Sequence, residues 1–294
     1  MSIFDKLLAE DLIKPPRFLK NNIIYEVLTG SHAYGTNLAE KSDFDIYGVG
    51  IPSKEMVFPH LSGEIPGFGR QIQRFEQFIQ HHIDYHGQKQ YDITIFSIVK
   101  YMHLCMENNP NMIDTLFVPQ DCITSINAIG QMIRSARTKF LHKGSYHKFL
   151  GYAHSQLHKM SSNKRTGNRA EIHAEHGFDV KFAMHLVRLA YEAEQILSEG
   201  DLDLRRHSEH LKAIRRGDVK ESDIREWFAS KEKYLEQLYR ESKLPHSPDE
   251  AEIKALLLAC LEHHFGSLDK AIVIPDRYES ALKEIGKILT RNGI

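Results

Sequence analysis

A short stretch near the N-terminus, Gly30–Asp45 (GSHAYGTNLAEKSDFD), combines residue types that suit phosphate and metal chemistry. Gly30 and Ser31 would open a helix, where free backbone N–H groups and a serine hydroxyl can hold a phosphate. Asp43 and Asp45 stand two positions apart on an expected strand, so their side chains project to one face. Paired carboxylates repel each other, but they are good ligands for a hard cation such as Mg²⁺. The pattern predicts a cation site beside a phosphate site.

Strand-like segments would position these residues. Ile23–Leu28 (IIYEVL) precedes the stretch and Asp43–Ile51 (DFDIYGVGI) ends it; both are rich in strand-forming residues. Tyr91–Phe96 (YDITIF) alternates apolar and polar side chains and is a further strand candidate. Residues 59–70 hold two prolines and three glycines, which predicts a loop.

The pattern changes in the second half of the chain. From about residue 124 it is almost wholly helical, and Phe178–Leu197 shows the helical period most clearly. We therefore predict an α+β fold. An α/β-like N-terminal domain with a small mixed sheet would cover residues 1–121, and an all-helical domain would cover residues 122–294.

The order strand, Gly-Ser, short helix and Asp-x-Asp resembles the nucleotidyltransferase domain of the DNA polymerase β superfamily. Gly30, Ser31, Ser42, Asp43 and Asp45 match the superfamily pattern without gaps. The resemblance implies that both aspartates hold two Mg²⁺ ions, for which Mn²⁺ can substitute, and that the glycine and the two serines bind a nucleotide.

The resemblance also implies a third catalytic and metal-binding carboxylate from a later strand. Asp92 in YDITIF is the best candidate, because Ile93 and Ile95 would face the opposite side of the strand. Asp84 is the second choice and Glu76 the third. The alternative is that Asp92 only caps its strand.

Later segments resemble a bacterial and phage group of predicted nucleotidyltransferases that is associated with RNA ligases and RNA repair. The matching segments are residues 91–119, 146–160 (YHKFLGYAHSQLHKM), 178–197 (FDVKFAMHLVRLAYEAEQIL) and 211–217 (LKAIRRG). The resemblance implies transfer of a nucleoside monophosphate from an NTP to an acceptor hydroxyl, with release of pyrophosphate. The implied acceptor is an RNA end, with tRNA as one candidate. Two alternatives stay open: an adenylyltransferase acting on a protein or a small molecule, and an inactive module that binds nucleotide or RNA.

Positive charge is concentrated in one part of the chain. Ile123–Ala170 contains nine lysines and arginines and no acidic residue, with histidines and aromatic residues between them. This pattern favours an acceptor or RNA surface. The residues that we expect to contact the acceptor are Lys143, Lys148, Lys159, Lys164 and Arg165. The alternative is a basic region that faces solvent or balances the acidic C-terminal third.

A second basic group follows the helical repeat. Lys181, His185 and Arg188 recur at i, i+4 and i+7, so they share one helix face. We expect this face to bind the nucleotide phosphates. The alternative is a solvated face paired with neighbours such as Glu192.

Composition excludes several classes of protein. Of 294 residues, 41% are hydrophobic and 26% charged, which excludes an intrinsically disordered chain. The net charge of −1 argues against a strongly basic protein that coats nucleic acid. Three scattered cysteines exclude a disulfide framework and a cysteine zinc site. We expect no targeting or membrane segment and a cytoplasmic protein, and the oligomeric state stays open.

Overall fold

A computed structural model describes residues 2–37, 43–87, 89–160 and 168–267, together with helical positions 285, 288 and 289. Its centre is a five-stranded sheet with the order β3-β4-β2-β1-β5. The strands are β1 (Ile23–Leu28), β2 (Phe44–Gly50), β3 (Gln77–Tyr85), β4 (Lys89–Ser97) and β5 (Ile123–Ile126). β2 and β4 are parallel, and the other neighbouring pairs are antiparallel. The α+β fold with a small mixed sheet is therefore confirmed.

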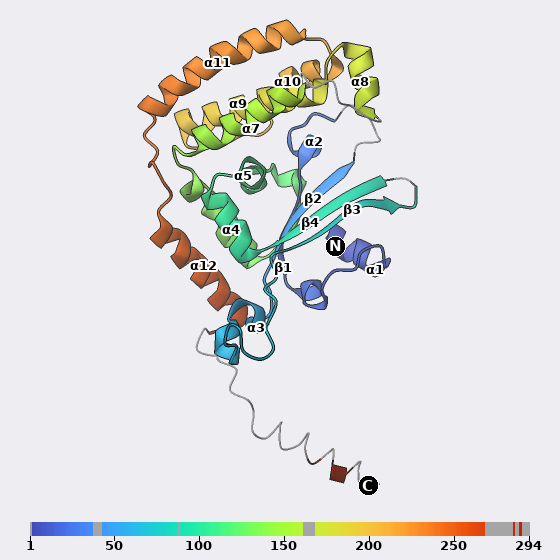
Figure 1. Cartoon of the computed structure of the whole chain (residues 1–294), viewed down its shortest axis with the longest axis vertical. Helices are drawn as coiled ribbons and strands as arrows, with labels where there is room; N and C mark the ends of the chain where they lie inside the picture. Colours follow the sequence, from blue (N-terminus) through green and yellow to red (C-terminus); the bar gives the residue numbers. More distant parts are fainter. Residues whose placement is uncertain are drawn as a thin grey trace.

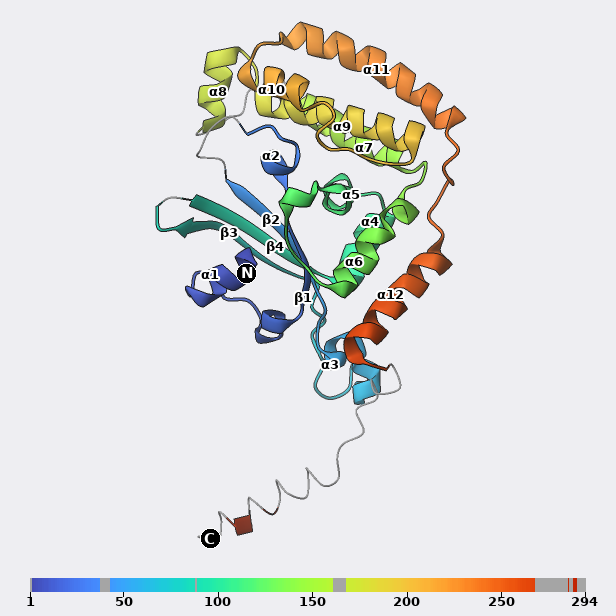
Figure 2. The same cartoon turned by 180° about the vertical axis from the view of Figure 1, so that it is seen from behind.

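Helices surround the sheet (Figures 1 and 2). The short ones near the N-terminus are α1 (Ile3–Ala9), α2 (Gly30–Ala33) and α3 (Lys54–Val57). Two helices, α4 (Ile98–Met106) and α5 (Pro110–Phe117), follow β4, and α6 (Ala128–Ser135) follows β5. The C-terminal part holds α7 (Ser145–Met160), α8 (Asn168–His176), α9 (Val180–Glu199), α10 (Ser208–Arg216), α11 (Glu221–Glu241) and α12 (Glu250–Phe265). None of the helices in the described ranges has the length and apolar character that crossing a bilayer requires.

The two faces of the sheet bury separate apolar clusters. α1 packs on one face, where Phe4 and Leu7 meet Ile46, Ile93 and Ile95. The other face and the C-terminal helices share a larger cluster that runs from β1 to α12. Residues of β2 and β4 alternate between these clusters, which is the reason that their sequences alternate in character.

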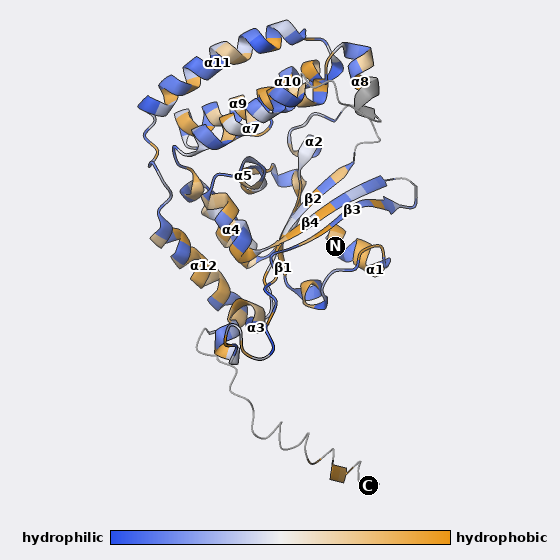
Figure 3. Cartoon of the chain, viewed as in Figure 1, coloured by the Kyte–Doolittle hydropathy of each residue, from blue (hydrophilic) through white to orange (hydrophobic). Residues whose placement is uncertain are grey.

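α9 is the central helix of the C-terminal layer. It packs along α7, and α10 and α11 flank it. Its Asp179 N-cap accepts hydrogen bonds from the N–H groups of Lys181 and Phe182, and Gly200 ends the helix in the left-handed conformation. α11 is mostly hydrophilic (Figure 3), because it buries little more than the stripe formed by Ile224, Phe228 and Leu235.

Two strands depart from the sequence prediction. β3 occupies an edge of the sheet, and most of its side chains are exposed or half-buried, so it lacks a clear apolar signal. β5 falls in the segment that we predict to be helical and pairs with β1. The sheet therefore takes its other edge strand from just beyond residue 121. In the predicted loop, residues Pro59–Ser62 form one turn of 3-10 helix.

Candidate active site

Two of the three predicted carboxylates are direct neighbours in the sheet. Asp45 on β2 and Asp92 on β4 are paired in the parallel register, so both project to the face that the C-terminal helices cover. Asp43 is exposed and directly precedes β2. Burial, followed by the negative charges of Asp92 and Asp43, raises the pKa of Asp45 from 3.8 to about 6. No hydrogen bond from the described part of the chain reaches the Asp45 carboxylate. The site therefore concentrates negative charge that a bound cation would neutralise.

The turn after β1 lies against this carboxylate. Gly30 has a φ of +60°, and a Cβ atom there would lie 2.3 Å from Asp45 Oδ2. Thr29 donates its backbone N–H to the Asp45 carbonyl oxygen at 2.8 Å and its hydroxyl to the same oxygen at 3.3 Å. Only glycine combines this backbone conformation with this close approach. Ser31, the next residue, is half-buried in the first turn of α2, where backbone N–H groups have no partner within the helix.

Two arginines from the C-terminal layer hold the same turn. Arg205 donates to the carbonyl oxygens of His32 and Ala33 at 3.1 and 3.3 Å. Arg215, on α10, donates to the carbonyl oxygen of Thr36 at 2.9 Å. The C-terminal helices therefore position the Gly-Ser turn, although they are distant from it in the sequence.

A bulge in β3 supplies partners for Asp92 that the sequence did not predict. His81 and His82 together stand opposite Asp92, and His82 has a φ of +56°. The backbone N–H of His82 donates to Asp92 Oδ1 at 2.7 Å, and His81 Nδ1 lies 3.4 Å from Asp92 Oδ2. Asp84, the second choice for the third carboxylate, is exposed and accepts a hydrogen bond from the N–H of Gly87 near the hairpin turn. The bulge fixes the Asp92 carboxylate beside Asp45.

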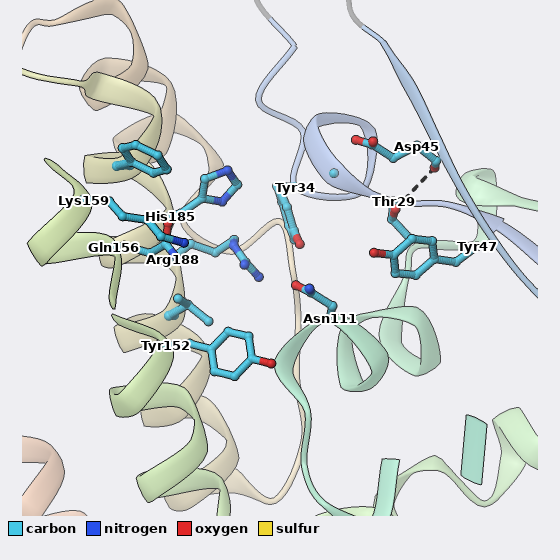
Figure 4. Close-up of a pocket in the computed structure, with 13 residues that line it drawn as sticks. Thr29, Tyr34, Asp45, Tyr47, Asn111, Tyr152, Gln156, Lys159, His185 and Arg188 are labelled. Atoms are coloured by element: carbon cyan, nitrogen blue, oxygen red, sulfur yellow. Dashed lines mark hydrogen bonds between the residues drawn. The ribbon is translucent and has the colours of Figure 1, made fainter. Parts of the chain in front are cut away.

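A cavity of about 420 Å³ opens from Asp45 between the sheet and the C-terminal helices (Figure 4). Its polar lining comes from the sheet and its nearest turn, from α5, and from α7 and α9. These side chains are Thr29, Tyr34, Asp45, Tyr47, Asn111, Tyr152, Gln156, Lys159, His185 and Arg188. The sequence predicted a site role for four of them: Asp45, Lys159, His185 and Arg188. Tyr152 and Gln156 lie in the YHKFLGYAHSQLHKM segment, so that segment already held the signal for them.

Arg188 occupies the back of the cavity in a buried ionic cluster. Its Nη1 donates to Asp114 Oδ2 at 2.6 Å and to both Glu192 carboxylate oxygens at 2.9 Å. The Tyr34 hydroxyl donates to the same Asp114 oxygen at 2.6 Å. Burial raises the pKa of both carboxyl groups, and the Arg188 guanidinium that they share offsets this effect only in part. Arg188 Nε is buried and has no hydrogen-bond partner among the described residues.

This cluster changes the expected role of the α9 face. The two acidic partners of Arg188 largely neutralise its charge. Arg188 also faces the cavity, and through Asp114 and Tyr34 it links α9 to α5 and to the end of α2. His185 lines the cavity, whereas Lys181 is not among its lining residues. Their nucleotide-binding roles stay predictions.

The predicted acceptor residues separate into three groups. Lys159 lines the cavity, and Lys148 is exposed on the same helix, with Nζ 3.5 Å from Glu107. Lys143 is buried, and its ammonium lies 5.9 Å from the centre of the Tyr239 ring, so the structure does not bring it to the same surface. Lys164 and Arg165 lie outside the described residues, as does Ser42 of the nucleotide-binding prediction.

The donors present fit a hard cation. Carboxylate oxygens are its preferred ligands, and Asp45 and Asp92 stand side by side. Within the residues that the structure describes, neither carboxylate forms an ion pair with a lysine or an arginine. In the described ranges, no group of three His, Cys, Asp or Glu side chains is already arranged around one point. Mg²⁺ does not require such a cage, because it keeps several waters and binds through one or two carboxylates together with substrate phosphates.

Comparisons with known proteins identify the family of the chain. Residues 9–264 match the family model described as the RNA repair pathway DNA polymerase beta family (RlaP). A similar solved structure is that of a nucleotidyltransferase-like protein from Exiguobacterium sibiricum, with 8% identity and a TM-score of 0.29. That similarity covers 80% of this chain and 73% of the other. No curated protein matches the chain. The family match confirms the resemblance that the Gly-Ser and Asp-x-Asp pattern predicted.

Proposed function

The chain belongs to the RNA repair pathway DNA polymerase beta family and is a nucleotidyltransferase, and from this membership we propose that it transfers a nucleoside monophosphate from an NTP to a hydroxyl at an RNA end. The acceptor oxygen would form a bond to the α-phosphorus. The bond between that phosphorus and the β-phosphate oxygen would break, and pyrophosphate would leave. The observation that carries the proposal is the pairing of Asp45 with Asp92 in the sheet, with Asp45 against the Gly30 turn and lining a polar cavity.

Asp43, Asp45 and Asp92 are proposed to hold two Mg²⁺ ions, for which Mn²⁺ can substitute. Bound there, the metal would neutralise charge on the triphosphate and lower the pKa of the attacking hydroxyl. Family membership implies a divalent cation in general terms, and the carboxylate donors support the magnesium assignment. The β3 bulge keeps Asp92 in place through the His82 N–H, so the two strands present their carboxylates together.

The nucleotide is proposed to lie in the cavity with its phosphates toward the Gly30 turn. Backbone N–H groups at Gly30 and Ser31 can donate to phosphate oxygens, and the positive φ of Gly30 lets the backbone approach closely. His185 and Arg188 lie across the cavity, and the unpartnered Nε–H of Arg188 is a donor that a nucleotide could satisfy. Ser42 and Lys181 remain in the proposal from the sequence pattern alone.

A labelling experiment tests the reaction. Purified chain is incubated with Mg²⁺, each α-labelled NTP in turn and total RNA, and products are separated from protein. We expect label in a discrete RNA species and its loss in Asp45→Asn and in Asp92→Asn. Asp84→Asn is the matched control, because its carboxylate lies at the hairpin turn, and it should keep the transfer activity. Label on protein alone would refute the RNA acceptor and favour protein adenylylation.

A further inference from the structure

A second, shallow cavity of about 420 Å³ adjoins the candidate active site along α7. Among the described residues, its lining comes from successive turns of this one helix: His147, Lys148, Gly151, Tyr152, Ser155, Gln156 and Lys159. Tyr152, Gln156 and Lys159 also line the catalytic cavity, so the two spaces meet at these residues. We call the surface formed by these seven residues the α7 groove. It leads from open solvent to the space beside Asp45.

The α7 groove carries positive charge. α7 contains no acidic residue, and Lys148 and Lys159 are exposed near its two ends. Lys148 faces Glu107 at 3.5 Å, and both side chains are exposed. Exposed ion pairs contribute little to stability. A phosphate could therefore replace Glu107 as the partner of Lys148 at small cost.

Gly151 stands where the fold does not require a glycine. It lies in the interior of α7, its backbone is helical, and a Cβ atom there would meet nothing within 4 Å. Glycine destabilises a helix interior relative to most residues. The space above Gly151 is part of the groove. Close approach of a ligand to the helix backbone would explain the missing side chain, and internal packing does not.

Tyr152 beside this glycine has the properties of a stacking surface. The residue is 37% exposed, although it also lines the catalytic cavity. Its hydroxyl accepts a hydrogen bond from Asn109 Nδ2 at 3.1 Å, which restrains the ring. Fixed, exposed aromatic rings stack on the bases of single-stranded nucleic acid without requiring a particular sequence.

We propose that the α7 groove binds the terminal nucleotides of a single-stranded RNA acceptor and directs its end toward Asp45. The sugar-phosphate backbone passes over Gly151, a base stacks on Tyr152, and phosphates lie near Lys148 and Lys159. These lysines are separated by roughly 16 Å of helix, at 1.5 Å per residue, which is room for a few nucleotides. The inference rests on the proposed function, because that function requires the RNA end to point toward Asp45. Binding of RNA in the groove can nevertheless be measured without nucleotide transfer.

The test is the affinity of the full chain for a short, 5′-labelled single-stranded RNA, measured by fluorescence anisotropy. Gly151→Gln fills the groove without a steric conflict inside the protein, and it should weaken RNA binding at least tenfold. Its melting temperature should stay the same or rise, because glutamine favours helix. His158→Gln is the matched control, since His158 is exposed on α7 and lines neither cavity, and it should bind as the wild type does.

Further variants test the other contacts. Tyr152→Ala should weaken binding by about five- to 150-fold, the range for loss of one stacked base. Lys148→Gln should reduce the slope of log affinity against log salt concentration by about 0.7, as loss of one phosphate contact to a single strand does.

The proposal is overturned if the wild type does not bind the RNA. It also fails if Gly151→Gln binds within twofold of the wild type, or if a blunt duplex binds as tightly as the single strand. Failure of the reaction gives a different result. If the wild type binds the RNA through Gly151 and Tyr152 but no nucleotide is transferred to it, the groove assignment stands and the proposed function is refuted. Asp45→Asn should keep the RNA affinity while it loses transfer.

Discussion

Replacing Asp45 by asparagine should stabilise the folded protein while it abolishes transfer. The carboxylate of Asp45 is largely buried, and its negative neighbours Asp92 and Asp43 repel it. No donor in the described part of the chain compensates for that burial. Asparagine has nearly the same shape and no charge, so it removes the repulsion and most of the burial cost. A residue that serves only the fold would show the opposite effect.

The magnitude follows from the raised pKa. The pKa of Asp45 in the folded chain is about 6, against 3.8 for an ordinary aspartate. Between these values the folded chain binds more protons than the unfolded chain, so stability falls as pH rises through this window. A difference of about 2 pKa units corresponds to about 3 kcal/mol, which is an upper bound because solvent reaches part of the site. Asp45→Asn should therefore be more stable than the wild type by up to about 3 kcal/mol at neutral pH.

The assay is urea unfolding of both proteins in EDTA, across a series of pH values from neutral to acidic. The difference in unfolding free energy between Asp45→Asn and the wild type should be largest at neutral pH. It should decrease as the pH falls toward 3.8, the ordinary pKa of an aspartate. Asp84→Asn, at an exposed position near the hairpin turn, controls for the loss of a surface carboxylate. An Asp45→Asn variant that is no more stable at neutral pH, or a gap that does not change with pH, would refute the argument.

Three other predictions follow from the same site. Mg²⁺ at a hundred times its dissociation constant should stabilise the wild type by about 2.7 kcal/mol in the urea assay without EDTA. The stability of Asp45→Asn should increase far less, and equal increases would place the cation elsewhere. Arg188→Met should lower the unfolding free energy by about 3–5 kcal/mol, because two buried carboxyl groups lose their counter-ion, and a change under 1 kcal/mol would contradict the buried cluster. Gly30→Ala should destabilise the chain by about 1–3 kcal/mol and reduce transfer at least tenfold, since the added methyl group conflicts with Asp45; normal activity would show that the turn can move aside.

The sequence was sufficient to predict the part of the site that lies on regular strands. Asp45 and Asp92 were predictable because strand side chains alternate, and Ile93 and Ile95 mark which face of β4 is apolar. The register that pairs Asp45 with Asp92 was not predicted and comes from the structure. The Gly-Ser turn was predictable for a similar reason, since its position after a strand and before Asp-x-Asp is a local pattern.

The contacts that join distant segments were not predictable. The bulge at His81 and His82 breaks the alternation of an edge strand. The sequence pattern therefore predicted neither β3 nor the hydrogen bond from the His82 N–H to Asp92. The sequence showed Arg188 near Glu192 at helical spacing, but it did not show Asp114, which is 74 residues away. Lys143 looked like part of a basic surface, because a sequence pattern does not distinguish a buried lysine from an exposed one.

The arginines that hold the Gly30 turn bear on how the chain acquires its shape during synthesis. Arg205 and Arg215 contact carbonyl groups that precede them by 172 to 179 residues. Contacts across such long loops form after local pairing, since loop closure costs conformational entropy that must be overcome first. A nascent chain emerging from the ribosome could therefore pair β1, β2 and β4 and align its carboxylates early. The Gly30 turn, which we propose to bind the nucleotide phosphates, would be held in place only after α10 has left the exit tunnel. An unfinished chain would therefore have paired carboxylates without a completed turn beside them.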